Sequence, residues 1–240
     1  MSSCRAQTTL PEIVPKEAWE REFSLTHAIP SSKRTEPAKA LVMFREILGL
    51  GPSVKVLDAG AGNGRNSVYL AKQGCHVTAV DSSESALGET RRRVEEAKLA
   101  DDVLIVRHSL GTTPVPFSAN SFDFVLDAYV FCHFLADEVR HGFWYDMGRI
   151  TKPGGHLLSI VFSPEDEYYA QFLADSPDGV LVRDPANGIW KRLYSEGQIK
   201  SFFADQFEMK YFAKVEFSDL VLGRVYRRVL LTSVLKKPTQ

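Results

Sequence analysis

The fold of this 240-residue chain is indicated by Val56-Leu57-Asp58-Ala59-Gly60-Ala61-Gly62-Asn63-Gly64. A short apolar run precedes the glycines and a helical pattern follows them, so a strand turns into a helix here. Glycines at alternate positions let the backbone turn sharply and approach a ligand without a Cβ in the way. The free N–H groups at the start of the following helix point at that ligand. The stretch therefore predicts a ligand site at the carboxyl edge of a sheet.

Strand and helix patterns alternate outward from this loop. Strands are predicted at 54–57, 76–80, 103–106, 122–126 and 155–162, and helices at 64–73, 83–98 and 137–151. Such alternation forms right-handed βαβ units on a parallel sheet. Two further β-like runs, near 207–217 and 223–235, have no helix between them and must pair antiparallel. We expect an α/β, Rossmann-like fold with a seven-stranded, mostly parallel sheet, an antiparallel C-terminal hairpin and helices on both faces.

Composition and charge narrow the class of protein. Apolar residues make up 44% and charged residues 25%, with a formal net charge of −1, which is typical of a globular chain and gives no sign of polyanion binding. No apolar stretch approaches the roughly 18–20 residues that span a bilayer, and no signal segment follows Met1. Cys4, Cys75 and Cys132 show neither a disulfide framework nor the spacing of a zinc site. We expect a cytoplasmic protein with no metal, no membrane contact and no nucleic-acid partner.

Two nucleotide cofactors compete for the glycine loop. A dinucleotide fingerprint starting at Gly60 needs glycine at position 65, where this chain has Arg65. The carboxylate of Asp58 would repel a pyrophosphate, whereas it would attract the amino group of a sulfonium-bearing amino acid. Asp81, at the end of the second strand, can accept both ribose hydroxyls of either cofactor, or it can simply cap the next helix. The loop therefore favours S-adenosylmethionine over NAD.

Four motifs resemble those of the class I S-adenosylmethionine-dependent methyltransferases. They are Asp58-Ala59-Gly60-Ala61-Gly62-Asn63-Gly64, Val80-Asp81, Ser121-Phe122-Asp123-Phe124-Val125 and Arg149-Ile150-Thr151-Lys152-Pro153-Gly154-Gly155. They run in the family's order over residues 54–162, and the C-terminal hairpin fits the family's last two strands. Residues 64–71 are similar to the small-molecule and tellurite-resistance-type branch. The resemblance implies that S-adenosylmethionine is the methyl donor and S-adenosylhomocysteine the product.

The resemblance also implies where the cofactor lies. It places Gly60, Gly62 and the Asp58 carboxylate around the methionine part and Asp81 on the ribose. The family usually has an acidic residue after the third strand for the adenine amino group, but this chain has Ser109 and Leu110 in that region. The expected cofactor-binding residues are Arg34, Asp58, Gly60, Gly62, Asn63, Asp81, Ser82, Ser109, Leu110 and Asp127.

Catalysis and acceptor binding are predicted around the fourth strand and in two flanking segments. Methyl transfer from a sulfonium is an in-line displacement, so the protein mainly positions the nucleophile and excludes water. His133 is either a base that titrates near neutral pH or a structural histidine. A tail and lid at 1–36, with loop at 24–35, would precede a methyltransferase domain at 37–240 that carries an insert at about 163–194. The expected acceptor-binding residues, which plain packing or an exposed loop would also explain, are Trp19, His27, Tyr129, Tyr169 and Trp190.

The sequence therefore predicts an enzyme that methylates an oxygen, nitrogen or chalcogen atom of a small molecule. The short basic runs Arg91-Arg92-Arg93 and 224–228 keep a methyltransferase of RNA or protein as an alternative. A third possibility is a catalytically silent S-adenosylmethionine-binding regulator.

Overall fold

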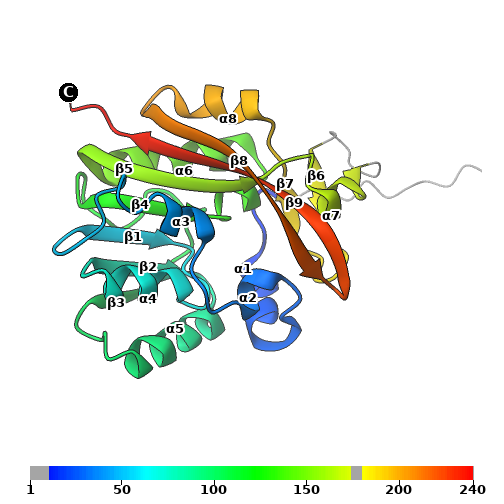
Figure 1. Ribbon diagram of the computed structural model, residues 1–240, viewed down its shortest axis with the longest axis horizontal. Coiled ribbons are helices and arrows are strands. Elements are labelled where there is room, and N and C mark those ends of the chain that lie inside the picture. The colour runs from blue at the N-terminus through cyan, green and yellow to red at the C-terminus, as the bar shows by residue number, and fades with distance from the viewer. Residues whose placement is uncertain (1–10, 174–179, 240) are drawn as a thin grey trace, which may run out of the picture.

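A seven-stranded sheet organises the computed structural model, which describes residues 11–173 and 180–239 (Figure 1). The strands are β1 (Lys55–Ala59), β2 (His76–Asp81), β3 (Val103–Arg107), β4 (Phe122–Ala128), β5 (Thr151–Phe162), β8 (Glu208–Val221) and β9 (Arg224–Lys236). Their order is β3-β2-β1-β4-β5-β9-β8. Strands β1 to β5 pair parallel, and β9 pairs antiparallel with both β5 and β8. The predicted fold class and the antiparallel C-terminal hairpin are confirmed.

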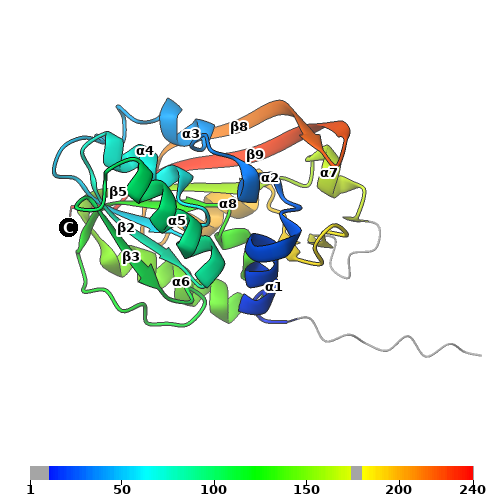
Figure 2. The ribbon, with the colours of Figure 1, turned by 90° about the horizontal axis from the view of Figure 1, so that it is seen from below.

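Helices cover both faces of the sheet (Figure 2). The first face carries α3 (Lys39–Met43), α4 (Arg65–Lys72) and α5 (Glu84–Glu96), and the second carries α6 (Asp137–Ile150) and α8 (Glu196–Phe203). Side chains alternate along a strand, so Val56 packs in the core of the first face and Leu57 in that of the second. Both side chains are fully buried, which explains why β1 is a continuous apolar run.

The direction of the connections places the site. The chain leaves β1 for α4 on the first face, whereas it leaves β4 for α6 on the second. In β1, Ala59 aligns with Val80 of β2 and Asp127 of β4, so the three strands end at one edge. A crevice opens at such a reversal of strand order. The glycine loop lies at that edge.

The N-terminal segment is more helical than the sequence predicts. It forms α1 (Lys16–Arg21), a π-helical turn η1 (Glu22–Thr26) and α2 (Pro30–Lys33), so the loop expected at 24–35 is wrong. The cause is Glu22, whose buried carboxylate accepts the N–H of Ile29 at 2.9 Å and the hydroxyl of Ser32 at 2.8 Å. Because these contacts are polar, the segment shows no apolar periodicity that would predict a helix.

The remaining elements lie near the carboxyl edge of the sheet. They are η2 (Phe131–His133), α7 (Glu167–Ala170) and a two-stranded sheet of β6 (Leu181–Arg183) with β7 (Trp190–Arg192). Residues 1–10 of the predicted tail and 174–179 of the predicted insert lie outside the described residues. Across 11–173 and 180–239, no helix combines the length and apolar character needed to cross a bilayer.

Candidate active site

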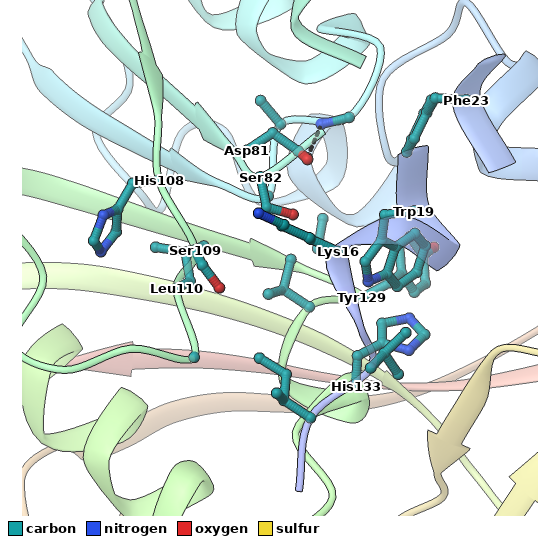
Figure 3. Close-up of a pocket in the computed structure, with 18 of the residues that line it drawn as sticks. Lys16, Trp19, Phe23, Asp81, Ser82, His108, Ser109, Leu110, Tyr129 and His133 are labelled. Atoms are coloured by element: carbon teal, nitrogen blue, oxygen red, sulfur yellow. Dashed lines mark hydrogen bonds between the residues drawn. The ribbon is translucent and has the colours of Figure 1, made fainter. Parts of the chain in front are cut away.

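A pocket opens where β1, β2, β3 and β4 end, beneath the N-terminal segment (Figure 3). We call it the cofactor pocket. It is lined by Ile13, Val14, Lys16, Trp19, Phe23 and Ile29 of the N-terminal segment, Gly60, Ala61, Gly62, Asn63, Arg65 and Asn66 of the glycine loop and α4, Asp81 and Ser82 after β2, residues 108–111 after β3, and Ala128, Tyr129, Val130, His133 and Phe134 after β4.

The glycine loop needs glycine at position 60 for two reasons. Its backbone is left-handed, with φ of +69°, and a Cβ there would collide with the side chain of Val130. Two residues on, the N–H of Gly62 donates to Asp81 Oδ2 at 2.9 Å. This bond fixes the loop of β1 against the end of β2.

Asp58 lies fully buried beneath the loop and does not line the pocket. Its Oδ2 accepts the hydroxyl of Ser67 at 2.6 Å, whereas its buried Oδ1 has no partner among the described residues. Burial raises the pKa of Asp58 to about 6, although the bond from Ser67 opposes the rise. Buried acceptors rarely stay unpaired, so a ligand that brings an ammonium group to this end of the pocket fits the site.

Ring-binding positions lie further along the pocket. Asp81 Oδ1 accepts the N–H of Ser83 at 3.0 Å, and Ser109 and Leu110 line the wall beyond it. His108 lines this wall as well, and its Nε2 is a buried atom with no hydrogen-bond partner within the described part of the chain. Sequence reasoning passed over His108, although it follows β3 where an acidic residue was expected.

The N-terminal segment is tied to the strand ends. Trp19 packs edge-on against His133, with 4.5 Å between ring centroids. Glu20, one residue on, accepts the hydroxyl of Ser83 at 2.8 Å and the N–H of Ser85 at 3.3 Å. Figure 3 shows Trp19 and Lys16 on one element, facing the wall that Ser82 and Ser109 form. The segment therefore closes one side of the pocket.

Asn63 completes this closure from the glycine loop. Its Nδ2 donates to the backbone carbonyls of Ser32 at 3.2 Å and Arg34 at 2.8 Å. These bonds hold the end of the segment beside the loop.

His133 is a neutral imidazole of defined tautomer. Its Nδ1 lies 2.9 Å from the carbonyl of Trp190, which can only accept, so Nδ1 carries the proton and Nε2 does not. Burial and the nearby positive charge of Lys191 lower the pKa of His133 to about 3. We expected a base titrating near neutral pH if this residue took part in catalysis; the structure instead places a hydrogen-bond acceptor in the pocket wall.

Tyr129 forms the wall at the end of β4. Its backbone is left-handed, with φ of +70°, and its N–H donates to the carbonyl of Ile160 at 3.0 Å. Such a backbone is costly for a residue with a side chain and is held by its surroundings. The Tyr129 ring stacks on Phe162 with 5.2 Å between centroids.

Four other predicted residues lie outside the lining of the cofactor pocket. Arg34 pairs with Asp219 at 2.5 Å, and His27 ends η1 in a left-handed conformation with φ of +44°. Tyr169 lines a neighbouring cavity, and Trp190 contributes only the carbonyl that fixes His133.

Asp127 is also buried away from the lining. Its Oδ1 accepts the N–H groups of Val130 and Phe131, at 3.1 and 3.0 Å, and its Oδ2 accepts the hydroxyl of Ser159 at 2.6 Å. Asp127 therefore holds the turn that carries Tyr129 and His133.

Sequence reasoning missed several lining residues. Lys16 and Phe23 belong to a segment without periodicity, and only the fold brings them to the loop. Arg65 and Asn66 were noted, but not as lining residues; their position at the start of the helix after the glycines was the available signal.

Comparison with known proteins identifies the core of the chain. Residues 56–155 match the family described as a methyltransferase domain. This region, which makes up less than half of the chain, is therefore similar to methyltransferase domains. The match spans the glycine loop, Asp81 and the turn after β4.

Curated methyltransferases are similar to part of the chain. A demethylmenaquinone methyltransferase of Tropheryma whipplei (strain Twist) is 32% identical over 127 residues, which are 53% of this chain and 49% of the relative. One from Mycobacterium sp. (strain JLS) is 36% identical over 117 residues, 48% of this chain and 45% of the relative. The chain thus spans about half the length of the curated relatives it matches.

A solved structure shows the same methyltransferase fold. It is Burkholderia thailandensis 1,6-didemethyltoxoflavin-N1-methyltransferase, with bound 1,6-didemethyltoxoflavin and S-adenosylhomocysteine. The TM-score is 0.65 at 20% identity, and the match covers 93% of this chain and 87% of that one.

Proposed function

We propose that this protein transfers a methyl group from S-adenosylmethionine to an oxygen, nitrogen or chalcogen atom of a small molecule. The observation that carries the proposal is one continuous pocket. It runs from Asp81 over the glycine loop to Tyr129 and His133. Asp58, two residues before Gly60 of that loop, has a buried Oδ1 without a partner among the described residues. The end at Asp81 thus suits a nucleoside, and the end at Tyr129 and His133 suits a reacting group.

Side chains and backbone along the pocket would hold the cofactor. The ammonium group of its methionine part would satisfy Asp58, close to the backbone of Gly60 and Gly62. Each oxygen of Asp81 already accepts one N–H and keeps a lone pair for a ribose hydroxyl. Ser109 and the N–H of Leu110 would contact adenine.

The chain's own residues position the acceptor and exclude water. The bound cofactor supplies a methyl group on a good leaving group. Trp19 and Phe23 cover the pocket, which shields the reacting atoms. The free Nε2 of His133 accepts the O–H or N–H of the acceptor and turns its lone pair toward the methyl carbon. With its pKa near 3, His133 orients this proton and does not store it.

We also infer a lid over residues 11–36, a methyltransferase domain from 37 onward and a cytoplasmic location. The lid proposal is supported by the hydrogen bonds of Glu20 and Asn63, and a reducing compartment by the free, buried thiols of Cys75 and Cys132.

A small-molecule acceptor is favoured over RNA. The names of the relatives mention demethylmenaquinone and 1,6-didemethyltoxoflavin, which are small molecules. The basic run on α5 is neutralised locally, since Arg92 pairs with Glu89 at 2.6 Å and Arg91 with Glu84 at 2.7 Å.

Methyl labelling tests the proposal. Purified protein would be incubated with methyl-labelled S-adenosylmethionine and a cell extract divided into small-molecule, RNA and protein fractions. We expect label in the small-molecule fraction only. Label confined to RNA or protein, or the absence of any transfer, would contradict the proposal.

A further inference from the structure

A second cavity adjoins the cofactor pocket, between the β8–β9 hairpin and the segment after β5. It shares Ile29, Arg65, Tyr129 and His133 with the cofactor pocket. We call it the acceptor cavity. Because Tyr129 and His133 lie in both linings, a molecule held here would present an atom to the reacting end of the cofactor pocket.

The acceptor cavity is rich in cations. Arg34, Arg65, Lys191 and Arg228 line it, and the only carboxylate in its described lining is Asp219. Lys191 is 2% and Arg228 3% exposed. Burying a charge is costly unless it is paired, so each of these cations needs a counter-charge.

Three of the four cations have one. The pairs are Arg34 with Asp219 at 2.5 Å, Lys191 with Asp184 at 3.3 Å and Arg228 with Asp166 at 2.8 Å. Arg228 also lies 3.5 Å from the second oxygen of Asp219. Asp219, the one carboxylate in the described lining, is therefore already paired.

Arg65 is the exception. Its side chain donates to the backbone carbonyl of Glu36 at 2.8 Å, and no described carboxylate lies within 4.0 Å of it. The residue is 7% exposed, and burial together with the positive charge of Arg34 lowers its pKa, while Tyr129 and the more distant carboxylates of Asp58 and Glu36 oppose that effect. An arginine keeps its proton under these conditions. Among the cations of the described lining, Arg65 is therefore the one without a carboxylate within 4.0 Å.

Aromatic rings form the walls around this charge. Tyr129 stacks on Phe162, and Tyr169 packs edge-on against Phe162 with 4.8 Å between centroids. Phe217 of β8 lies in the same lining. Flat, apolar walls with a single unbalanced cation suit a planar ring that bears one anionic group.

We propose that the methyl acceptor is a small planar molecule with one negative charge, which pairs with Arg65 in the acceptor cavity; this rests on the function proposed above. Its nucleophilic atom attacks the methyl carbon, the carbon–sulfur bond breaks and the sulfur keeps the electron pair. A proton on the nucleophile leaves to solvent. The products are the methylated acceptor and S-adenosylhomocysteine.

Arg65 lies on the acceptor side more than on the cofactor side. Besides the cofactor pocket, it lines the acceptor cavity and a further cavity beside β8. Neither of these two contains a glycine of the loop, Asp81 or Ser82. The carbonyl of Glu36 that accepts from Arg65 belongs to the same side.

Calorimetry with matched ring probes tests the proposal. Benzoate, benzamide and benzylamine would be titrated into protein saturated with S-adenosylhomocysteine. We expect benzoate to bind at least about tenfold more tightly than the neutral and cationic rings, because it alone supplies the missing counter-charge. Equal binding of benzoate and benzamide, or binding of no ring at millimolar concentration, would overturn the proposal.

Three variants locate the charge. Arg65→Gln should abolish the preference for benzoate, and Arg65→Lys should keep it because the charge remains. Arg91→Gln, an exposed arginine on α5, should behave as wild type. If Arg65→Gln proves unfolded in thermal denaturation, the lysine variant still decides, because loss of the preference there contradicts a purely ionic role.

Cofactor titrations separate the two ways to fail. Methylthioadenosine lacks the amino-acid carboxylate of S-adenosylhomocysteine. If Arg65→Gln binds S-adenosylhomocysteine more weakly, binds methylthioadenosine as before and still prefers benzoate, then Arg65 holds the cofactor. That result would overturn the proposal. If wild-type protein does not bind S-adenosylhomocysteine at all, the proposed function fails, and this proposal fails with it.

Discussion

At the scale of single residues, Asp58 connects burial to cofactor binding. Its pKa is raised to about 6 because the folded protein buries the carboxyl group fully, and its Oδ1 has no hydrogen-bond partner among the described residues. In the unfolded chain an aspartate titrates near about 3.9. Between these two pKa values, Asp58 of the folded protein without ligand therefore holds a proton that the unfolded chain has released. The resulting stability is fully present below about pH 4 and is lost as pH rises through about 6.

An ammonium group reverses this preference, which leads to a prediction about pH. Affinity for S-adenosylhomocysteine should rise as pH increases through about 6 and level off above it, since the ligand binds the carboxylate form. Calorimetry between pH 5 and 8 measures the change. Asp58→Asn should flatten the profile, whereas Asp127→Asn, at a buried aspartate with the same raised pKa but no unpaired oxygen, should keep it. A flat wild-type profile would rule out the contact with Asp58.

His133 gives a second prediction at this scale. His133→Ala should lower kcat by about 10- to 100-fold, because the acceptor loses an orienting hydrogen bond, while affinity for S-adenosylhomocysteine stays within about threefold. Since the pKa of His133 is lowered to about 3, titration of His133 should not change the wild-type rate between pH 5 and 8. A change of rate with pH near the ordinary histidine pKa that disappears in His133→Ala would instead identify a titrating base.

Among structural elements, the N-terminal segment has the most specific attachments. Glu20 reaches from α1 to Ser83 and Ser85 at the start of α5, whereas Glu17 of the same helix is exposed. The prediction is that Glu20→Ala weakens binding of S-adenosylhomocysteine by about three- to tenfold and speeds tryptic cleavage within α1, because lost charge-assisted bonds loosen the lid. Calorimetry and timed proteolysis read both effects. Identical behaviour of Glu20→Ala and Glu17→Ala would show that α1 is no lid.

The elements also show what could be predicted from sequence. Gly60, Gly62 and Asp81 line the same pocket, and local sequence pointed to them because loop, strand end and helix start are adjacent in the chain; that they bind a cofactor stays a prediction. The start of α8 is equally local: Ser195 and Gln198, three positions apart, form a capping box with both of its hydrogen bonds. The π-helical turn at Glu22 was missed because the contacts that stabilise it, with Ile29, Ser32 and the distant Asn187, are polar and leave no apolar periodicity.

The acceptor side could not be predicted for a related reason. Arg34 was expected among the cofactor-binding residues, but it pairs with Asp219 of β8, which the antiparallel hairpin brings near. That Arg65 has no carboxylate within 4.0 Å among the described residues is likewise visible only after the neighbouring ion pairs are known. Local motifs therefore predicted the cofactor wall, and long-range pairing determines the acceptor wall.

At the scale of the whole molecule, Phe131 joins the site to the rest of the core. Its fully buried ring meets five others, on α6, on α8 and in the segment between them: Phe143, Trp144, Tyr194, Phe202 and Phe203. It follows the turn that carries Tyr129, so the aromatic cluster supports the wall between the two cavities.

Removing this ring should destabilise the fold as a whole. Phe131→Ala should lower the free energy of unfolding by about 3–5 kcal/mol, through lost burial and a cavity. Tyr145→Ala, at a ring 65% exposed on α6, should change it by less than about 0.5 kcal/mol. Urea denaturation followed by circular dichroism compares the two variants, and equal losses would show that the cluster does not anchor the core.

The central claim is that the glycine-loop pocket binds S-adenosylmethionine and not a dinucleotide. Calorimetric titration with S-adenosylhomocysteine, with NAD run in parallel, tests it most directly. We expect micromolar binding of S-adenosylhomocysteine and none of NAD. Binding of NAD, or of neither ligand, would contradict it.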